Sequence, residues 1–265
     1  MSAEPRRAAV LGQPIAHSKS PLLHSAAYRE LGLDWKYERF EVAESELEEF
    51  LARVDPDFIG FSVTMPLKGE AYRLSGETDS NSRRTRACNT LVRIEGGWRG
   101  YNTDVSGFAE VLKGSGFRSA LVLGAGATAR SALVALAELG VEELVVAARR
   151  PEVAAAALSD LAIEGSVSAL TDPLPAAQLV VNTLPAGAAD GLELPAGCEA
   201  VFDVVYEPWP TALAAKANAS RLRVWNGLDL LVAQAVEQVL LMTGARDSES
   251  LRIASAMRAA LEGSD

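Results

Sequence analysis

Four short polar segments interrupt the apolar sequence in the first half of this chain. They are His17 to Pro21, Ser62 to Lys68, Asn89-Thr90 and Asn102 to Asp104. Each of them lies next to a predicted strand, and open sheets bind their ligands in the loops at the carboxyl ends of strands. The hydroxyl and amide groups of these segments suit a small ligand that carries several hydroxyl groups.

A glycine-rich turn in the second half has the spacing of a dinucleotide-binding motif. The run from Gly124 to Ala129 reads G-A-G-A-T-A, as in G-x-G-x-x-G/A, and lies between a predicted strand and a predicted helix. Gly124 permits the tight turn, and Gly126 lets the backbone approach a pyrophosphate at the positive end of the helix. An ordinary glycine-rich turn between a strand and a helix is the alternative.

Two arginines follow the next predicted strand, at the place where an NAD enzyme carries Asp or Glu for the ribose hydroxyls. Arg149 and Arg150 can bind a 2′-phosphate with bidentate hydrogen bonds, whereas a carboxylate would repel it. The pair therefore favours NADP over NAD. A solvated basic patch in front of a helix that starts at Pro151 is the alternative.

Elements that position these residues can be predicted from periodicity and turn residues. In the first hundred residues we predict strands over 8–12, 36–42 and 58–63, helices over 22–31 and 44–54, and a hairpin that joins 90–94 to 98–101 through Gly96-Gly97. From residue 120 onward we predict strands over 121–123, 144–147, 179–181, 200–205 and 222–225, and helices over 127–139 and 152–161. Such alternation indicates a parallel sheet covered on both faces. Two closing helices are predicted over 228–242 and 249–261.

Composition excludes several classes of protein. The chain has 265 residues, 49% of them hydrophobic, and a net charge of −10, which argues against a nucleic-acid partner or an anionic membrane surface. Its two cysteines, Cys88 and Cys198, do not support a disulfide framework, and we expect both to be buried thiols in a reducing cytosol. Without a signal-like start or a membrane-length apolar run, a cytoplasmic location is expected.

The polar segments and the glycine turn occur in the order found in the shikimate dehydrogenase family. On the substrate side, the family motif G-x-P-I-x-H-S-x-S-P is similar to Gly12 to Pro21, and N-V-T-x-P-x-K is similar to Ser62 to Lys68. The family's N-T and N-T-D blocks match Asn89-Thr90 and Asn102 to Asp104. Its cofactor turn matches Gly124 to Ala127, and its closing G and L-V-x-Q-A resemble Gly227 and Leu231 to Ala235. The resemblance covers nearly the whole chain.

This resemblance implies that NADPH reduces the ring ketone of 3-dehydroshikimate to shikimate, reversibly, in the biosynthesis of aromatic amino acids. Lys68 and Asp104 would be the catalytic pair. The arrival of a hydride creates an alkoxide, which needs a proton and a nearby positive charge, and an ammonium beside a carboxylate can supply both. Either member of the pair could be the first to exchange the proton with the substrate oxygen.

The resemblance also implies substrate contacts. Ser18 and Ser20 would hold the carboxylate, and the ring hydroxyls would be contacted by Thr64, Asn89, Asp104 and Gln234, with Tyr206 near the substrate. Ser20 could instead cap a helix, Asn89 could be a turn residue, and Tyr206 could be a core aromatic. Periodicity alone places Gln234, Glu237 and Gln238 on a solvent-exposed helix face, so only the resemblance turns Gln234 inward.

On the cofactor side, the implied contacts are Gly124, Ala125, Gly126, Ala127, Thr128, Arg149, Arg150, Val204 and Gly227. The chain departs from the family pattern at four places. Ser62 stands where many relatives have Asn, and Leu230 replaces a common Met. The second arginine of the usual N-R-T-x-x-R clamp is absent at its usual place, and Asn182 to Gly187 differs from the usual N-A-T-x-x-G. We expect His17 to be structural, with its ring bonded to a backbone group, and we expect no metal site.

We therefore predict two α/β domains. The substrate domain, with a mostly parallel sheet, comprises residues 1–103 and the C-terminal helices 227–265, and a Rossmann-like NADP domain comprises 104–226. The chain could be a monomer or a homodimer. One alternative is a quinate or aminoshikimate dehydrogenase of the same family. A second is a methylene-tetrahydrofolate dehydrogenase-like protein, which the His17 to Pro21 segment disfavours. A third is a non-catalytic NADP-binding regulator, which Lys68 and Asp104 disfavour.

Overall fold

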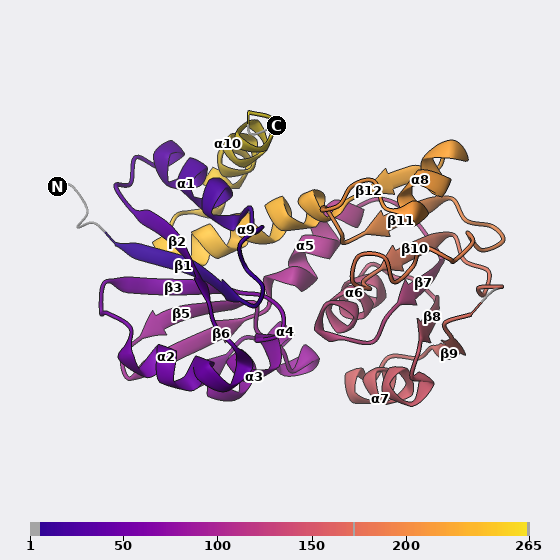
Figure 1. Cartoon of the computed structure of the whole chain (residues 1–265), viewed down its shortest axis with the longest axis horizontal. Coiled ribbons are helices and arrows are strands. Elements are labelled where there is room, and N and C mark those ends of the chain that lie inside the picture. The colour runs from indigo at the N-terminus through magenta and orange to yellow at the C-terminus, as the bar shows by residue number, and fades with distance from the viewer. Residues whose placement is uncertain (1–5, 172, 264–265) are drawn as a thin grey trace. The chain divides into compact units, whose positions relative to one another are not determined.

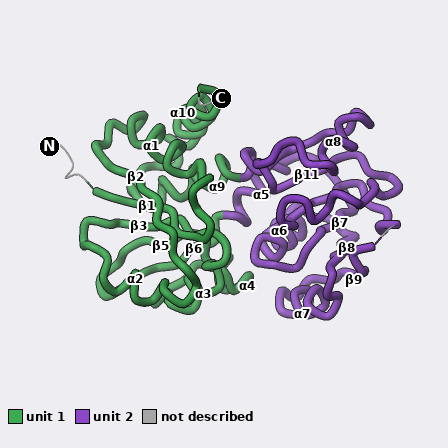
Figure 2. The backbone as a smooth tube through the Cα atoms, in the orientation of Figure 1, with its two compact units in different colours: residues 1–103, 231–265 green, residues 104–230 purple. Residues whose placement is uncertain are grey.

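The computed structural model describes residues 6–171 and 173–263, which form two compact units (Figures 1 and 2). Unit 1 comprises residues 1–103 and 231–265, and unit 2 comprises residues 104–230. The chain leaves unit 1 at the start of helix α5 (Thr103–Leu112) and returns within helix α9 (Gly227–Thr243). The predicted two-domain α/β fold is confirmed. The second boundary falls at Leu230 rather than before Gly227, because Leu230 packs in the core of unit 2.

Unit 1 contains a six-stranded sheet of order β2-β1-β3-β5-β6-β4. Its strands are β1 (Arg7–Gly12), β2 (Lys36–Glu41), β3 (Phe58–Val63), β4 (Glu77–Thr78), β5 (Thr90–Ile94) and β6 (Gly97–Tyr101). Its helices are α1 (Ser20–Glu30), η1 (Glu44–Glu46), α2 (Leu47–Arg53), α3 (Lys68–Leu74), α4 (Ser80–Thr85), most of α9, η2 (Asp247–Glu249) and α10 (Ser250–Glu262). The pairs β1–β2, β1–β3 and β4–β6 are parallel, and β5 runs antiparallel to β3 and β6.

Strand β1 explains why this sheet begins with an unbroken apolar sequence. Ala8 and Val10 pack in one core cluster with side chains of α1, α9 and α10, whereas Ala9 and Leu11 pack in another with side chains of α2 and α3. Successive side chains of a strand point to opposite faces, so a strand covered on both faces is apolar throughout. Helices on both faces thereby hold the carboxyl ends of β1 and β3 in place.

Unit 2 contains a parallel six-stranded sheet of order β12-β11-β10-β7-β8-β9. Its strands are β7 (Ser119–Leu123), β8 (Glu143–Ala148), β9 (Ser166–Ala169), β10 (Leu179–Asn182), β11 (Ala200–Asp203) and β12 (Arg223–Trp225), and its helices include α5, α6 (Ala127–Glu138), α7 (Pro151–Leu161) and α8 (Ala212–Ala219). The order reverses between β7 and β10: β7, β8 and β9 follow one another toward one edge of the sheet, and β10, β11 and β12 toward the other. Parallel sheets bind ligands at this kind of reversal.

Short elements account for most differences from the predicted elements. Helices α3, α4, α5 and α8 and strands β4 and β9 were not predicted. The six residues of α4 and the two of β4 are too few for a periodic pattern. The predicted hairpin is confirmed as β5–β6, but its turn is Glu95-Gly96, since Ile94 pairs with Gly97. Cys88 is buried as expected, whereas Cys198 is only half-buried.

His24 of α1 is the structural histidine of unit 1. Its ring is fully buried, stacks on Tyr37 with the ring centroids 3.9 Å apart, and places Nδ1 3.0 Å from the carbonyl oxygen of Ser20. Burial disfavours the imidazolium and lowers the pKa of His24 from 6.5 to about 4. The buried ring bonded to a backbone group is therefore that of His24, and the expectation for His17, which is exposed, was wrong.

This buried histidine makes the fold sensitive to acid. The unfolded chain takes up the His24 proton near pH 6.5 and the folded chain only near pH 4, so stability is lost as the pH falls through this window. We expect the free energy of unfolding to fall by up to about 3 kcal/mol from this residue alone. His24→Phe should flatten the pH dependence in urea titrations between pH 7 and pH 4, and His17→Ala should not. Equal pH dependence in wild type and His24→Phe would contradict the assignment.

Candidate active site

The predicted substrate residues of unit 1 gather at one edge of its sheet. Strands β1 and β3 are parallel, with Leu11 opposite Val63, so the loops that follow them leave from the same edge. The backbones of the two loops are joined, since the N–H of Gln13 donates to the carbonyl of Met65 at 3.1 Å, and the N–H of Thr64 donates to the carbonyl of Leu11 in β1 at 2.9 Å. Because β5 runs antiparallel to β3 and β6 antiparallel to β5, the start of β5 and the end of β6 reach this edge as well.

Asn89 lies at the centre of this edge, directly before β5, and only 2% of it is exposed. Its carbonyl accepts from the N–H of Val63 at 2.7 Å, and its Oδ1 accepts from the N–H of Thr103 at 2.9 Å. Its Nδ2 donates to Oε1 of Gln234 at 3.1 Å. Asn89 thus links the end of β3, the start of α5 and helix α9, which is a larger role than that of a turn residue.

Lys68 and Asp104 both occupy helix N-termini rather than the loops in which we expected them. Lys68 is the first residue of α3 and is half-buried, and its carbonyl accepts from the N–H of Cys88 at 2.9 Å. Asp104 lies in the first turn of α5 and is buried. A carboxylate is favourable at a helix N-terminus, where it faces the positive end of the helix dipole. The start of α3 and Thr103 at the start of α5 are each hydrogen-bonded to the Cys88-Asn89 segment.

The two serines at the start of α1, Ser18 before the helix and Ser20 within it, are both buried. Oγ of Ser18 accepts from the N–H of Ser20 at 3.3 Å. Ser20 is the first residue of the helix, and the capping position belongs to Lys19, whose side chain makes no capping hydrogen bond. The alternative in which Ser20 caps α1 is therefore wrong, and its hydroxyl is available at the sheet edge.

Helix α9 differs from what its periodicity predicts. Gln234 and Gln238 are buried, with exposed fractions of 7% and 1%. The polar face turns inward because it meets the amide and hydroxyl groups of Asn89 and Thr90 instead of water. The inward orientation that the family resemblance implies for Gln234 agrees with this burial, and the solvent-exposed face predicted from periodicity was wrong.

A cavity of ≈ 220 Å³ in unit 2 contains most of the predicted cofactor residues. It lies at the carboxyl ends of β7, β8 and β10 and is lined by Gly124, Ala125, Gly126, Ala148, Arg149, Arg150, Val153, Thr183, Leu184 and Pro185. Gly124 has φ of +104°, a conformation that only glycine adopts without strain, and Gly126 caps α6. The glycine turn and both guanidinium groups therefore share one cavity, at the reversal of strand order.

Three residues of this cavity wall, Thr183 to Pro185, were not predicted as site residues. They follow β10, and the side chain of Thr183 donates to the carbonyl of Leu123 at 2.7 Å, beside the glycine turn. The signal that could have found them is their position after a buried strand. Ala148 and Val153 complete the wall and were also missed.

The remaining predicted cofactor residues do not line this cavity. Ala127 and Thr128 begin helix α6. Val204 follows β11 and its N–H donates to the carbonyl of Asn182 at 3.0 Å, and Gly227 donates its N–H to the carbonyl of Val205 at 3.3 Å. Tyr206 is half-buried in the same segment. Val204, Tyr206 and Gly227 thus form a separate group at the ends of β11 and β12.

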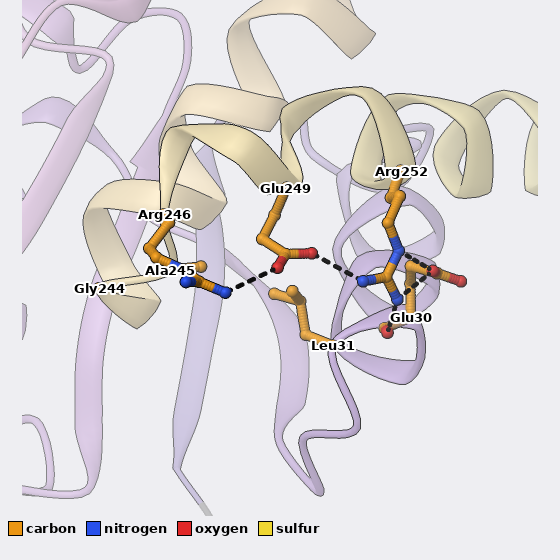
Figure 3. A pocket seen from close by; sticks show the side chains of 7 residues that line it. All are labelled: Glu30, Leu31, Gly244, Ala245, Arg246, Glu249 and Arg252. Carbon is orange, nitrogen blue, oxygen red and sulfur yellow. Dashed lines mark hydrogen bonds and ion pairs between the residues drawn. The ribbon is translucent and has the colours of Figure 1, made fainter.

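A second cavity, in unit 1, contains none of the predicted site residues. It is lined by Glu30, Leu31, Gly244, Ala245, Arg246, Glu249 and Arg252 (Figure 3). Arg252 pairs with Glu30 at 2.7 Å and with Glu249 at 2.9 Å, and Arg246 lies 3.7 Å from Glu249. The charges of this cavity are thus matched within it, and we assign it no ligand.

Among residues 6–171 and 173–263, no group of three or more His, Cys, Asp or Glu side chains is placed to hold a metal ion. Within the same residues, no helix has both the length and the apolar character needed to span a membrane.

Comparisons with known proteins all indicate the same family. Residues 10–91 match the family model of the shikimate dehydrogenase substrate binding domain. The chain is 36% identical to the shikimate dehydrogenase (NADP(+)) of Aeropyrum pernix over 91% of this chain and 93% of the relative. It is similar to the crystal structure of Mycobacterium tuberculosis shikimate dehydrogenase, with a TM-score of 0.88 and 40% identity over 98% and 100% of the two chains. The Thermus thermophilus enzyme in complex with NADP(H) and shikimate gives a TM-score of 0.82 and 34% identity over 96% and 99%.

Proposed function

The chain belongs to the shikimate dehydrogenase family, and we propose that it catalyses the reversible, NADP-dependent reduction of 3-dehydroshikimate to shikimate. One observation carries the proposal: the chain contains both halves of the required site. Buried hydroxyl and amide groups gather at one sheet edge of unit 1, and unit 2 has a cavity that combines a glycine turn with two guanidinium groups. A polyhydroxylated ring acid suits the first half, and a dinucleotide with a 2′-phosphate suits the second.

Initial rates with the purified protein test this function directly. Shikimate and quinate should each be offered with NADP⁺ and with NAD⁺. We expect the highest kcat/KM for shikimate with NADP⁺. A preference for quinate or for an aminoshikimate would move the chain to a sister activity of the same family, and no turnover of any of them would contradict the enzyme assignment.

Lys68 and Asp104 form the proposed catalytic pair. NADPH supplies the hydride to the ring carbonyl carbon, and the carbonyl oxygen then needs one proton. The ammonium of Lys68 holds a proton at Nζ and carries the positive charge that stabilises the developing alkoxide. Asp104 holds the lysine in place and accepts a hydrogen bond from a substrate hydroxyl. The hydrogen bonds from the Cys88-Asn89 segment to Lys68 and Thr103 support this pairing, because they tie both helix starts to one segment.

The remaining contacts follow the same division. Ser18 and Ser20 bind the substrate carboxylate through their hydroxyl groups, and Thr64, Asn89 and Gln234 bind the ring hydroxyls. Tyr206 lies in a different group, with Val204 and Gly227, after β11. We propose that this group contacts the nicotinamide end of the cofactor and the substrate beside it.

The residues of the unit 2 cavity fit NADP rather than NAD. Ala125 and Gly126 offer backbone N–H groups directly before α6 for the pyrophosphate, and Ala127 and Thr128, which begin α6, extend this surface. Gly124 makes the tight turn of the site, and its own N–H donates to the carbonyl of Ala147 at 2.9 Å. Arg149 and Arg150 are exposed on the cavity wall and bind the 2′-phosphate. None of the described residues that line this cavity is acidic.

Removing both guanidinium groups should erase the cofactor preference. For the variant Arg149→Ala/Arg150→Ala we expect kcat/KM for NADP⁺ to fall by about 10²-fold, because two charge-assisted hydrogen-bonding groups are lost. The value for NAD⁺ should change by less than about twofold, since NAD⁺ lacks the phosphate that these groups bind. Arg118→Ala, which removes an exposed charge paired with Glu142 elsewhere in unit 2, is the control. An equal loss for both cofactors would show that the arginines act through the fold.

We also propose that the protein works in the cytoplasm as a monomer or a homodimer. Both cysteines are free thiols, in keeping with a reducing compartment. Sedimentation of the purified protein at micromolar concentration distinguishes the two assembly states.

A further inference from the structure

A chain of hydrogen bonds crosses the core of unit 1 from β2 to α9 and ends at Asn89. The hydroxyl of Tyr37 donates to Oγ of Ser62, and Oγ of Ser62 donates to Oε1 of Gln238 at 2.7 Å. Nε2 of Gln238 donates to Oγ1 of Thr90 at 2.9 Å and to the carbonyl of Asn89 at 3.3 Å. Oγ1 of Thr90 then donates to Oδ1 of Asn89 at 2.9 Å. Every hydrogen in this chain points toward Asn89.

Backbone groups determine the direction of the chain. A backbone N–H can only donate and a backbone carbonyl can only accept, so each amide side chain bonded to one has a single orientation. Oδ1 of Asn89 accepts from the N–H of Thr103 at 2.9 Å. Nε2 of Gln238 faces the carbonyl of Asn89, and Nε2 of Gln234 donates to the carbonyl of Leu231 at 3.0 Å. The orientations of all three amides are therefore mutually consistent.

The five side chains of this chain of hydrogen bonds are buried, with Gln238 at 1% and Thr90 at 0% exposure. Buried polar groups have no water to replace a lost partner, and hydrogen bonds in a region of low polarity strengthen one another. A change at Gln238 therefore reaches Asn89 both directly at its carbonyl and through Thr90. None of the residues Tyr37, Thr90 and Gln238 belongs to the proposed substrate contacts.

Gln234 is the next residue beyond Asn89 in this series of hydrogen bonds. Its Oε1 accepts from Nδ2 of Asn89 at 3.1 Å, and one hydrogen of its Nε2 is used by the carbonyl of Leu231. The second hydrogen of Nε2 is the group that Gln234 can offer to a ligand. A reversed Asn89 amide would present oxygen to Gln234 and would force Gln234 to reverse as well.

We propose that Gln238 is a positioning residue for substrate binding, which holds Asn89 in the orientation set by the N–H of Thr103 and through it supports Gln234, so that Gln234 presents an N–H donor to an oxygen acceptor on the substrate ring. This inference rests on the proposed function, in which Asn89 and Gln234 contact the substrate. It assigns the hydrogen-bond polarity of that contact to residues that do not touch the substrate.

The link through Thr90 can be cut without a large change in packing. Thr90→Val keeps the shape of the side chain and removes the hydroxyl, whereas Thr90→Ser keeps the hydroxyl. We expect Thr90→Val and Gln238→Met each to raise KM for shikimate about tenfold, since each removes a hydrogen bond that holds Asn89 in place. KM for NADP⁺ should stay unchanged and kcat should stay within about twofold. Thr90→Ser, which keeps the hydroxyl, should have the wild-type KM for shikimate.

A combined variant separates positioning from stability. Gln238→Met alone leaves Ser62 and Thr90 short of partners and lowers the melting temperature. Tyr37→Phe/Ser62→Ala/Gln238→Met removes the buried partners together, which should return the melting temperature toward wild type while KM for shikimate stays raised. Thr243→Val, on the same helix, removes the hydrogen bond from Oγ1 to the carbonyl of Val239 at 2.7 Å and is the control, with unchanged KM.

The outcomes distinguish this inference from the proposed function. If wild type oxidises shikimate but Thr90→Val and Gln238→Met leave KM unchanged, the inference is overturned and the function stands. Recovery of KM together with the melting temperature in the combined variant would also overturn it, because the residues would then act only through stability. If wild type does not oxidise shikimate, the proposed function fails and this inference fails with it.

Discussion

Lys68→Ala is expected to lower kcat for shikimate oxidation by about 10³-fold or more, which is the size of effect that loss of a general acid–base group produces. Lys68 begins α3 and is half-buried, so its ammonium group is the proposed carrier of both the proton and the positive charge at the reacting oxygen. NADP⁺ affinity should not change, because Lys68 does not line the unit 2 cavity. Steady-state kinetics together with a fluorescence titration of NADPH binding measure the two effects separately.

Two further variants sharpen this result. Lys68→Arg keeps a positive charge but holds its proton too tightly to exchange it near neutral pH, so it should recover little of the lost kcat. Lys113→Ala removes an exposed lysine that lies 3.8 Å from Glu110, and it should leave both parameters at wild-type values. Turnover by Lys68→Ala within tenfold of wild type would show that Lys68 is not the catalytic group.

Substitutions in the glycine turn should have the second largest effect, and the two glycines should differ in kind. Gly124→Ala places a residue with a side chain at φ of +104°, and its Cβ would lie 2.7 Å from Oγ1 of Thr183. We expect a loss of about 1–3 kcal/mol in the free energy of unfolding, together with weaker NADPH binding, because the wall formed by Thr183 has to move. Thermal unfolding of the free protein and NADPH titration report the two losses.

Gly126→Ala is the matched comparison. Gly126 has φ of −82° and ψ of −171°, and a Cβ there has nothing within 4 Å. The substitution should cost less than about 1 kcal/mol of stability, the loss of a glycine cap. NADPH affinity should nevertheless fall by about tenfold or more, because the methyl group occupies the space into which the pyrophosphate comes. Wild-type NADPH affinity in Gly126→Ala would mean that the pyrophosphate does not approach the chain at this residue.

Burial of the α9 amides shows where prediction from periodicity fails. On an isolated helix, Gln234 and Gln238 form a polar face, and a polar face is normally hydrated. In unit 1 this face meets Asn89 and Thr90, which lie more than a hundred positions earlier in the chain and supply the hydrogen bonds that water would otherwise provide. A local pattern carries no information about such a partner. The same reason applies to the two histidines: His24 is buried against Tyr37 of the neighbouring strand, whereas His17 lies exposed in the loop after β1.

The sequence by itself determined those features that depend on local chemistry. The glycine spacing at Gly124 and Gly126, the absence of an acidic residue beside Arg149 and Arg150, and the ordered polar segments before Lys68 and Asp104 are readable because turns, caps and strand ends impose their residue types locally. Only the tertiary structure decided which distant groups meet. Strand order places the loops after β1 and β3 beside Asn89, and Thr183 beside the glycine turn, because sheet pairing is a long-range choice that no window of sequence contains.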